Sequence, residues 1–278
     1  MKTNIVDNKS SLEMDDKKIA LKSDEEDFFI KNDKAYFIKN TDQGFTEGSQ
    51  DILVNKIKLF LKKYPRFFSF IFTIFNMGFV GKNAKKAIKE IGNDKIILNL
   101  GSGMKKVRND VINVDFYPFQ NVDVVADISN LPFVDNSVDA VINEFVLEHV
   151  KNPEVIVREI YRILKLGGIL YITIPFVASF HSSPSDYYRW TKHGLLEMLK
   201  DFEKQECGVR CGPTLAVVYI ISEWMSIILS FGSTKIQQVL FVIFMILLFP
   251  LRLLDYLISK FPTSENIAYG FYYIGKKK

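Results

Sequence analysis

The fold is decided by the stretch Ile96-Ile97-Leu98-Asn99-Leu100-Gly101-Ser102-Gly103. Its first five residues form an apolar run broken by Asn99, which predicts a buried strand that the two glycines end. Downstream, apolar runs at 111–115, 122–125, 138–143 and 169–174 predict further strands. Before the last of these, Asn152-Pro153-Glu154 predicts the start of a helix and Gly167-Gly168 its end. Strands alternating with a helix in this way predict an α/β fold with a parallel sheet.

The sequence on either side of this core divides the chain into five expected parts. Residues 1–27 are polar and charged and predict a flexible tail. Residues 28–81 form an accessory segment, with a hairpin over 28–38 and an apolar helix over 67–80 that either lies in a membrane interface or caps the core. The core is expected over 82–212, an apolar helical insertion over 213–262, and the last strand with a basic tail over 263–278.

Composition excludes several classes of protein. The chain has 278 residues, 36 Lys and Arg against 32 Asp and Glu, and therefore a net charge of +4, too small a surplus to indicate a nucleic-acid partner. Cys207 and Cys211 are the two cysteines and cannot form a disulfide framework; without a nearby His or Cys cluster they predict no metal site. The 24 Phe residues, many in apolar runs, point toward a membrane surface.

Three loops after the first three strands carry the informative residues, at the edge where open α/β sheets bind ligands. Gly101-Ser102-Gly103 lets the backbone approach a ligand, Asp115 can accept both hydroxyls of a ribose, and Asp127 with Ile128 can meet an adenine amino group beside an apolar wall. Residues 104–110 are too few for a crossover helix whose N-terminus would face a pyrophosphate. We therefore expect a ligand that contains adenosine without a pyrophosphate.

In combination these stretches resemble the class I S-adenosylmethionine-dependent methyltransferases, in particular the bacterial branch with a methyltransferase type 11 domain. The resemblance covers about residues 96–174. Its stretches are Leu98-Asn99-Leu100-Gly101-Ser102-Gly103, Asn113-Val114-Asp115, Val125-Ala126-Asp127-Ile128, Leu131-Pro132-Phe133, Asp135-Asn136-Ser137-Val138-Asp139, Glu148-His149-Val150 and Glu159-Ile160-Tyr161-Arg162-Ile163-Leu164-Lys165-Leu166-Gly167-Gly168.

The resemblance implies a Rossmann-like, seven-stranded methyltransferase sheet with flanking helices, and S-adenosylmethionine as the cofactor. It places the cofactor-binding residues at the strand ends: the glycine loop at the methionine part, Asp115 at the ribose, Asp127 and Ile128 at the adenine, and Asn143 or Glu144 on the methyl-transfer side. The members of the glycine loop are Gly101, Ser102 and Gly103. Asn99 stands where the family often has an acid that helps to bind the cofactor's amino group, and the first crossover is shortened.

Methyl transfer from a sulfonium is an in-line displacement, so the protein mainly aligns the reactants and excludes water. A base is needed when the acceptor is a hydroxyl or a carbon acid. The candidate catalytic residues are His149, after the fourth strand, and His181 and Asp186 in the polar, aromatic loop after the fifth. A structural role for His149 is the alternative, and the loop either covers the site and hydrogen-bonds a sugar-like acceptor or acts as a conformational plug.

Two apolar stretches, 215–231 and 239–258, fall between the last two strands, which pair in this fold. Both ends of the insertion must then lie on one side of a bilayer, which excludes a single spanning helix. Glu223, Arg252 and Asp255 interrupt the stretches, which makes full insertion costly and favours a hairpin lying in the interface. A homodimer surface or a lid is the competing explanation.

Together these features predict a methyltransferase acting on a hydroxyl of a saccharide or lipid-linked glycan intermediate. We expect a bacterial protein, peripherally associated with the cytoplasmic face of the cell membrane. Methylation of a soluble small molecule, from a quinone pathway or secondary metabolism, is one alternative. A non-catalytic scaffold that binds an adenosine ligand is another.

Overall fold

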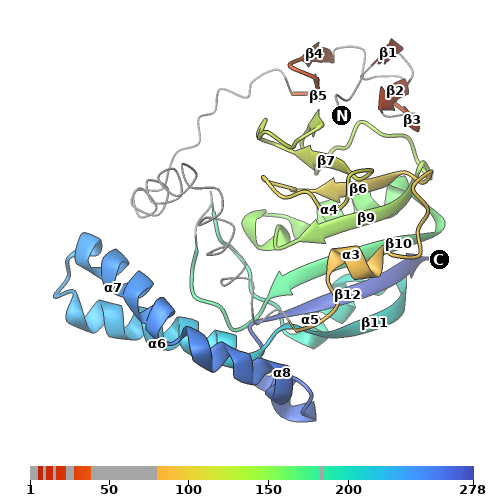
Figure 1. The fold of residues 1–278 in the computed structure, drawn as a ribbon. Helices are drawn as coiled ribbons and strands as arrows, with labels where there is room; N and C mark the ends of the chain where they lie inside the picture. The colour runs from red at the N-terminus through yellow and green to blue at the C-terminus, as the bar shows by residue number, and fades with distance from the viewer. Residues whose placement is uncertain (1–5, 9–10, 15–16, 23–27, 39–79, 182–184) are drawn as a thin grey trace.

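The computed structural model describes residues 6–8, 11–14, 17–22, 28–38, 80–181 and 185–278 (Figure 1). Of the apolar stretch expected over 67–80, all but Val80 lies outside the described residues.

The described core is a mixed sheet with the expected α/β architecture. Its strands are β6 (Ile97–Leu100), β7 (Ile112–Asp115), β8 (Val124–Val125), β9 (Val138–Glu144), β10 (Leu164–Pro175), β11 (Phe202–Cys211) and β12 (Gly270–Lys277). They lie side by side in the order β11-β12-β10-β9-β6-β7-β8. Neighbours from β10 to β8 run parallel, whereas β12 runs antiparallel to β10 and β11. The seven-stranded sheet implied by the resemblance is therefore present.

The expected hairpin adds two strands to one edge of this sheet. It consists of β4 (Phe29–Lys31) and β5 (Lys34–Tyr36), joined by Asn32 and Asp33, which both have positive φ. β5 pairs with β8 in parallel, so the whole sheet has nine strands in the described part of the chain. The hairpin covers the free backbone groups of β8, which as a two-residue strand would otherwise form an exposed edge.

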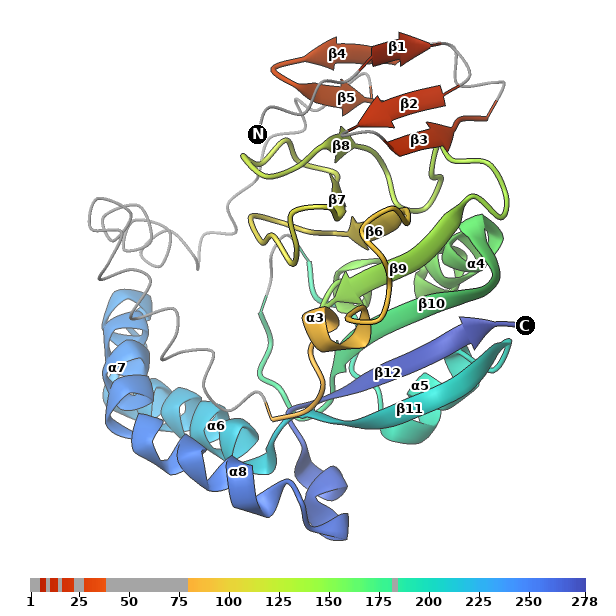
Figure 2. The same cartoon turned by 45° about the vertical axis from the view of Figure 1, so that its right-hand side comes forward.

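Both faces of the sheet are covered, which explains why its strands are apolar on both sides. On one face Leu98 and Leu100 pack in a cluster with the helices α4 (Pro153–Ile163) and α5 (Lys192–Met198). On the other face Ile97 and its neighbours pack against the short helix α3 (Ala84–Ala87). Figures 1 and 2 show α3 on one side of the sheet and α4 and α5 on the other. Thr191 caps α5, accepting a hydrogen bond from the Gly194 N–H at 3.1 Å.

The prediction of a flexible tail over 1–27 is wrong for the residues described there. Three antiparallel strands, β1 (Val6–Asn8), β2 (Ser11–Met14) and β3 (Lys17–Ala20), form a second small sheet. Leu12, Ile19 and Leu21 are at most 4% exposed and join the main core cluster. They cover the sheet face beside the crossover 126–137, where the chain forms no helix. Backbone bonds join Lys22 N to Pro132 O at 2.9 Å and Val134 N to Ala20 O at 3.2 Å.

Helix α4 also ends earlier than expected. It stops at Ile163, and Leu164 already pairs with Val138 as the first residue of β10. The register of β10 then shifts between Leu164 and Ile169, and Gly167 in this interval has a φ of 73°. Gly167 therefore serves an irregularity within the strand and does not cap the helix.

The apolar insertion is helical, as expected, and leaves the sheet between two paired strands. It contains α6 (Pro213–Leu229), α7 (Thr234–Leu247), the 3-10 turn η2 (Phe249–Leu254), α8 (Asp255–Ile258) and the 3-10 turn η3 (Pro262–Ile267). Cys211 and Gly270, at its two ends, are register partners. Pro175, the last residue of β10, is paired with Gly270 as well. The insertion therefore projects from the edge where the parallel strands end (Figures 1 and 2).

None of the described helices is by itself long and apolar enough to cross a membrane. The segments Thr234–Leu247 and Phe249–Ile258 meet that requirement as a pair, with a bend of 48° between them.

Candidate active site

The glycine loop after β6 has one glycine required for packing and one that borders open space. Gly101 has a φ of 67°, and a Cβ added to it would lie 2.5 Å from Cγ2 of Val146. Gly103 has a φ of 55°, and an added Cβ would meet no atom within 4 Å. The backbone at Gly103 is therefore accessible to a ligand.

Asp115, at the end of β7, is tied directly to this loop. Its Oδ2 accepts the Gly103 N–H at 2.8 Å and its Oδ1 accepts the Tyr117 N–H at 3.0 Å. Burial raises the pKa of the Asp115 carboxyl. A carboxylate has about four lone-pair positions, so each oxygen can accept a further hydrogen bond from a hydroxyl of a ligand.

Asp127 and Ile128 follow β8 beside Asp115, because the Ala126 N–H donates to the Asp115 carbonyl at 3.0 Å. Ile128 is half-buried against the core cluster, whereas Asp127 is exposed. The Asp127 Oδ1 accepts bonds from the Ser129 N–H at 2.8 Å and from Ser129 Oγ at 2.7 Å. This turn presents one polar and one apolar side chain at the sheet edge, as predicted.

Two buried polar atoms at the same edge have no partner among the described residues, Ser102 Oγ and Asn143 Oδ1. The amide of Asn143 donates to the Leu100 carbonyl at 3.2 Å, which holds the end of β9 beside the glycine loop. Glu144, next along β9, is half-buried. By contrast, the amide of Asn99 donates to Asn113 Oδ1 at 3.1 Å and links β6 to β7. Buried polar groups are rarely left without a hydrogen-bond partner, so the unpartnered Ser102 Oγ and Asn143 Oδ1 indicate a polar ligand.

A second group of polar residues follows β9. Phe145 has a φ of 54°, and its N–H donates to Thr173 O and Oγ1, each at 3.1 Å. The chain thus turns sharply into the 3-10 helix η1 (Leu147–His149), which carries Glu148 and His149. Glu148 is fully buried, and neither of its carboxylate oxygens has a hydrogen-bond partner among the described residues. Burial raises the pKa of Glu148 to about 8.

His149 and His181, predicted from separate loops, meet at this carboxyl group. The Nε2 of His149 lies 3.9 Å from Glu148 Oε1, and the Nε2 of His181 lies 4.0 Å from the same atom. The two imidazole rings are in edge-to-face contact, with ring centroids 5.1 Å apart. Burial and the neighbouring His149 lower the pKa of His181.

Comparison with known proteins agrees with this arrangement of strand ends and loops. Residues 76–172 match the family model of the methyltransferase domain. The chain carries a methyltransferase domain. No curated protein matches the sequence.

Several solved structures are similar to this methyltransferase at low identity. An S-adenosylmethionine-dependent methyltransferase from Thermotoga maritima is 17% identical, with a TM-score of 0.46 over 80% of this chain and 97% of that one. Phosphoethanolamine N-methyltransferase 2 from Haemonchus contortus, in complex with phosphomonomethylethanolamine and S-adenosylhomocysteine, is 18% identical, with a TM-score of 0.41 over 69% of this chain and 51% of that one. The [4+2]-cyclase SpnF is 16% identical, with a TM-score of 0.44 over 69% of this chain and 78% of that one.

S-adenosylmethionine is the cofactor of the methyltransferase domain. The residues at the strand ends fit such a ligand, because Gly103 borders open space and Asp115 has free lone pairs beside it. The unpartnered Ser102 Oγ and Asn143 Oδ1 add polar groups at the same edge.

Asp186 lies behind His181 in the methyltransferase. Arg189 donates two hydrogen bonds to the Asp186 carboxylate, of 2.5 Å to Oδ1 and 2.6 Å to Oδ2. Burial alone would raise the pKa of Asp186, but the bonds from Arg189 and the His181 N–H, together with the charge of Arg189, lower it. Asp186 Oδ2 also accepts the His181 N–H at 2.8 Å and lies 3.7 Å from His181 Nδ1. Asp186 is therefore placed to position His181.

The loop that carries these residues is anchored over η1. The Tyr187 N–H donates to the Glu148 carbonyl at 2.7 Å, and the Tyr188 hydroxyl donates to the Lys151 carbonyl at 2.7 Å. At its far end the Trp190 N–H donates to the Pro175 carbonyl at 3.1 Å. These bonds hold the described residues 185–190 in place while Tyr187 and Tyr188 stay 44% and 39% exposed. Two aromatic side chains thus remain available to an acceptor.

Glu148 is the site residue to which the sequence analysis gave no role. It appeared there as part of the motif Glu148-His149-Val150. Glu148 is adjacent to a candidate catalytic histidine in the sequence. Adjacency in the sequence does not predict which of two neighbouring side chains is buried.

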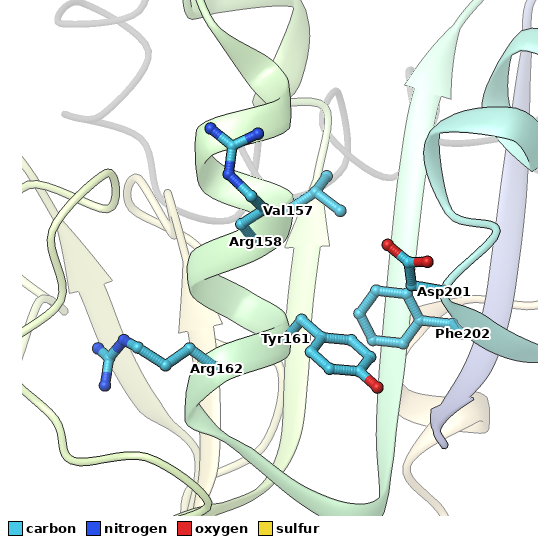
Figure 3. Close-up of a pocket in the computed structure, with 6 residues that line it drawn as sticks. All are labelled: Val157, Arg158, Tyr161, Arg162, Asp201 and Phe202. Atoms are coloured by element: carbon cyan, nitrogen blue, oxygen red, sulfur yellow. The ribbon is translucent and has the colours of Figure 1, made fainter.

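A pocket of about 220 Å³ lies away from this site, on the outer side of α4. It is lined by Val157, Arg158, Tyr161, Arg162, Asp201 and Phe202. The rings of Tyr161 and Phe202 are in edge-to-face contact, with centroids 5.1 Å apart, and Figure 3 shows the guanidinium groups of Arg158 and Arg162 pointing away from them. The pocket lies toward the end of α4 that leads into β10, which is the sheet edge opposite the predicted cofactor residues.

Proposed function

We propose that this methyltransferase methylates a hydroxyl group of a saccharide carried by a lipid-linked glycan intermediate, at the cytoplasmic face of a membrane. The observation that carries the proposal is the placement of Glu148, His149 and His181 at the sheet edge from which the apolar insertion projects. The proton-accepting side chains and the apolar surface would then both contact the same methyl acceptor.

The polar cluster supports a hydroxyl acceptor. Bound S-adenosylmethionine supplies a methyl group activated by a sulfonium. A hydroxyl acceptor has to lose its proton as its oxygen takes the methyl group, and a neighbouring base assists that step. The ring nitrogens of His149 and His181 and the carboxyl of Glu148 can receive the proton. The anchored loop over η1 contributes Tyr187 and Tyr188, whose exposed rings can pack against a sugar.

The apolar insertion supports a membrane-borne acceptor, because the three charged residues that interrupt its apolar stretches, Glu223, Arg252 and Asp255, are buried or hydrogen-bonded within it. Lys235, at the start of α7, and Lys260, after α8, are exposed. Glu223 Oε1 accepts a bond from Gln237 Nε2 at 2.9 Å, so this pair joins α6 to α7. Arg252 is 1% exposed, and Asp255 is fully buried and accepts the Thr214 N–H at 2.7 Å and the Leu215 N–H at 2.9 Å. Asp255 thus caps the start of α6.

With these three charges held within the insertion, large apolar side chains dominate the outside of the helices. Phe231, at the turn between α6 and α7, is 93% exposed, and Trp224 is 59% exposed. Further exposed apolar residues on the insertion are Ile220, Ile227, Ile228, Ile236, Val239, Ile246, Leu247, Leu251, Leu253, Leu254, Tyr256 and Leu257. An apolar surface of this extent is rare on a monomer in water and is typical of a membrane or protein interface.

Mass spectrometry of lipid-linked glycans from cells with and without this protein tests the proposal. We expect a species heavier by one methyl substitution in cells with the protein, and its loss in cells that carry Asp115→Asn. A methyl group found in a water-soluble product instead would favour a soluble small-molecule acceptor. Absence of heat on titrating the purified protein with S-adenosylmethionine would favour a non-catalytic scaffold.

A further inference from the structure

We propose that Glu148, His149 and His181 form a binding site for a divalent transition-metal ion such as Zn²⁺. The sequence predicted no metal site, and the cysteines on which that expectation rested lie on β11, away from these three residues. The proposal concerns ligands drawn from η1 and from the loop after β10.

The three potential ligand atoms lie close together and are of suitable types. Two imidazole nitrogens and a carboxylate oxygen lie within 4.8 Å of one another. Zn²⁺ binds such atoms at about 2.0–2.2 Å, which places neighbouring ligands about 3–3.5 Å apart. The separations of 3.9 and 4.0 Å from Glu148 Oε1 to the two Nε2 atoms need a contraction of about half an ångström each, within the reach of small side-chain rotations.

The second ring nitrogen of each histidine already has a partner that favours metal binding. The Nδ1 of His149 lies 2.5 Å from the Ser185 carbonyl, and the Nδ1 of His181 lies 3.3 Å from the Ser179 carbonyl. A carbonyl accepts and never donates, so the bond to Ser185 places the proton of His149 on Nδ1 and leaves a lone pair on Nε2. The Nδ1 of His181 also lies 3.5 Å from Arg189 Nη2, so its Nε2 is free to bind a metal in the tautomer that donates to the Ser179 carbonyl. Histidines that bind metals usually show this arrangement, in which the outer nitrogen donates to a carbonyl or carboxylate.

The burial of Glu148 is an independent observation that points to a cation. Its side chain is fully buried, and neither oxygen has a hydrogen-bond partner among the described residues. A buried carboxyl without partners is costly to ionise, and a metal ion is one of the few groups that would stabilise its ionised form. The Arg189 guanidinium does not fill this role, because Asp186 takes its two bonds to a carboxylate.

The surroundings leave the site supported and accessible. Arg189 also donates to the Ser179 carbonyl at 2.8 Å, the same carbonyl that faces His181 Nδ1, so this second layer is itself held in place. The His181 side chain is 44% exposed and the His149 side chain 17%, which gives an ion a path from solvent.

The chemical consequence of such an ion rests on the proposed function, whereas its binding does not. Three protein ligands leave coordination positions open, as in catalytic zinc sites. With the ion bound, the three residues would serve as its ligands instead of accepting the proton, and a substrate hydroxyl bound to the ion would become more acidic. Its O–H bond would break with the electron pair left on oxygen, and the proton would pass to solvent water before that oxygen takes the methyl group.

The test is metal binding by the full chain after removal of bound ions with a chelator and dialysis. Titration calorimetry with ZnCl₂ is expected to show a single site, and Co²⁺ is expected to give visible absorption bands of a site with nitrogen and oxygen ligands. His181→Gln and Glu148→Gln are each expected to weaken Zn²⁺ binding at least about tenfold. The matched control is His193→Gln in helix α5, outside the cluster, which should bind as the native chain does.

Unfolding temperature and S-adenosylhomocysteine binding are measured on the same samples. His181 is the more exposed ligand, so its variant should fold even if Glu148→Gln does not. Zn²⁺ binding that is absent, or unchanged in His181→Gln, would overturn the proposal, as would a Co²⁺ spectrum of thiolate ligands from Cys207 or Cys211. A methyltransferase that methylates its glycan acceptor without binding Zn²⁺ would refute the metal site and leave the proposed function intact.

Discussion

The two glycines after β6 allow the packing and ligand-binding demands of one loop to be separated. Gly101→Ala places a Cβ 2.5 Å from Val146 at a positive φ, so we expect a loss of about 2 kcal/mol or more in unfolding free energy. In Gly103→Ala the added Cβ meets open space, so backbone strain alone lowers the unfolding free energy, by about 1 kcal/mol. Urea unfolding of both variants measures the difference.

The same pair of variants tests where the cofactor lies. The Cβ of Gly103→Ala would occupy space that we expect the cofactor to approach, so its binding of S-adenosylhomocysteine should fall at least about tenfold with little loss of stability. Undiminished affinity in Gly103→Ala would remove this glycine from the cofactor site.

Asp115 and Asp127 differ in what they can contribute to cofactor affinity. Asp115 is buried and tied to the glycine loop, so Asp115→Asn should weaken S-adenosylhomocysteine binding by about 10- to 100-fold through loss of charge-assisted hydrogen bonds. Asp127 is exposed, so Asp127→Asn should cost about tenfold or less. Calorimetry on both variants, with unfolding curves as a control for the loop, checks this order. A larger loss for Asp127→Asn than for Asp115→Asn would contradict it.

At this scale the sequence predicted residues at strand ends better than residues in turns. Asp115 and Asp127 each follow a buried strand, and parallel strands end at one sheet edge, so their proximity follows from the pattern alone. The meeting of His149 with His181 depends on the left-handed Phe145 and on an anchored loop, neither of which the apolar pattern shows. The unpartnered state of Glu148 is a property of tertiary packing.

At the scale of elements, α4 holds the crossover 126–137 that has no helix of its own. Glu159 Oε1 accepts the Leu131 N–H at 2.7 Å, and Arg162 donates to the Phe133 carbonyl at 2.8 Å. The two side chains also bind each other at 2.6 Å. Arg162→Met removes the bonds that Arg162 donates and leaves the largely buried Glu159 without its arginine partner, which should cost about 2–3 kcal/mol of unfolding free energy.

The acid response of the protein gives a second test of this pair. Burial alone would raise the pKa of Glu159, but bonds from Arg162 and the Leu131 N–H outweigh it and hold that pKa below its ordinary value. A carboxyl with a depressed pKa contributes stability above its unfolded pKa, and that stability is lost as the pH falls through the folded value. Glu159→Gln should therefore flatten the loss of stability below about pH 5. Parallel acid profiles for Glu159→Gln and the native chain would contradict this role.

The N-terminal sheet shows why element prediction failed at one place in the chain. Residues 11–21 alternate apolar and polar side chains over stretches too short to stand out from a charged tail. They form strands because Leu12, Ile19 and Leu21 cover a sheet face beside a crossover without a helix. The sequence showed the first crossover to be short, but the segment that packs beside the crossover 126–137 lies about a hundred residues away from it, and no local pattern connects the two.

At the scale of the whole molecule, the sheet edge that carries the candidate site residues is also the edge from which the apolar insertion projects. Cys211, Pro175 and Gly270 meet in one register at the base of the insertion, beside the ends of β9 and β10. The sequence predicted that both ends of the insertion lie together, because adjacent strands of one sheet flank it. The sequence could not predict the contacts that Glu223, Arg252 and Asp255 make within the insertion. A charged residue in an apolar stretch can face solvent, a bilayer or the end of a neighbouring helix, and the sequence does not distinguish these surroundings.

This orientation predicts that the insertion binds a phospholipid surface through its outer apolar side chains. Phe231 and Trp224 are 93% and 59% exposed, and burial of one such side chain contributes about 1.5–3 kcal/mol, or about tenfold or more in affinity. Phe231→Glu should therefore reduce cosedimentation with vesicles of phosphatidylglycerol and phosphatidylethanolamine at least about tenfold. Leu166→Glu is the matched control, because Leu166 is 75% exposed on β10 at the opposite sheet edge. If instead the native chain ignores the vesicles and sediments as a dimer that Phe231→Glu dissociates, the surface pairs two copies of the chain, and the acceptor need not be held in a membrane.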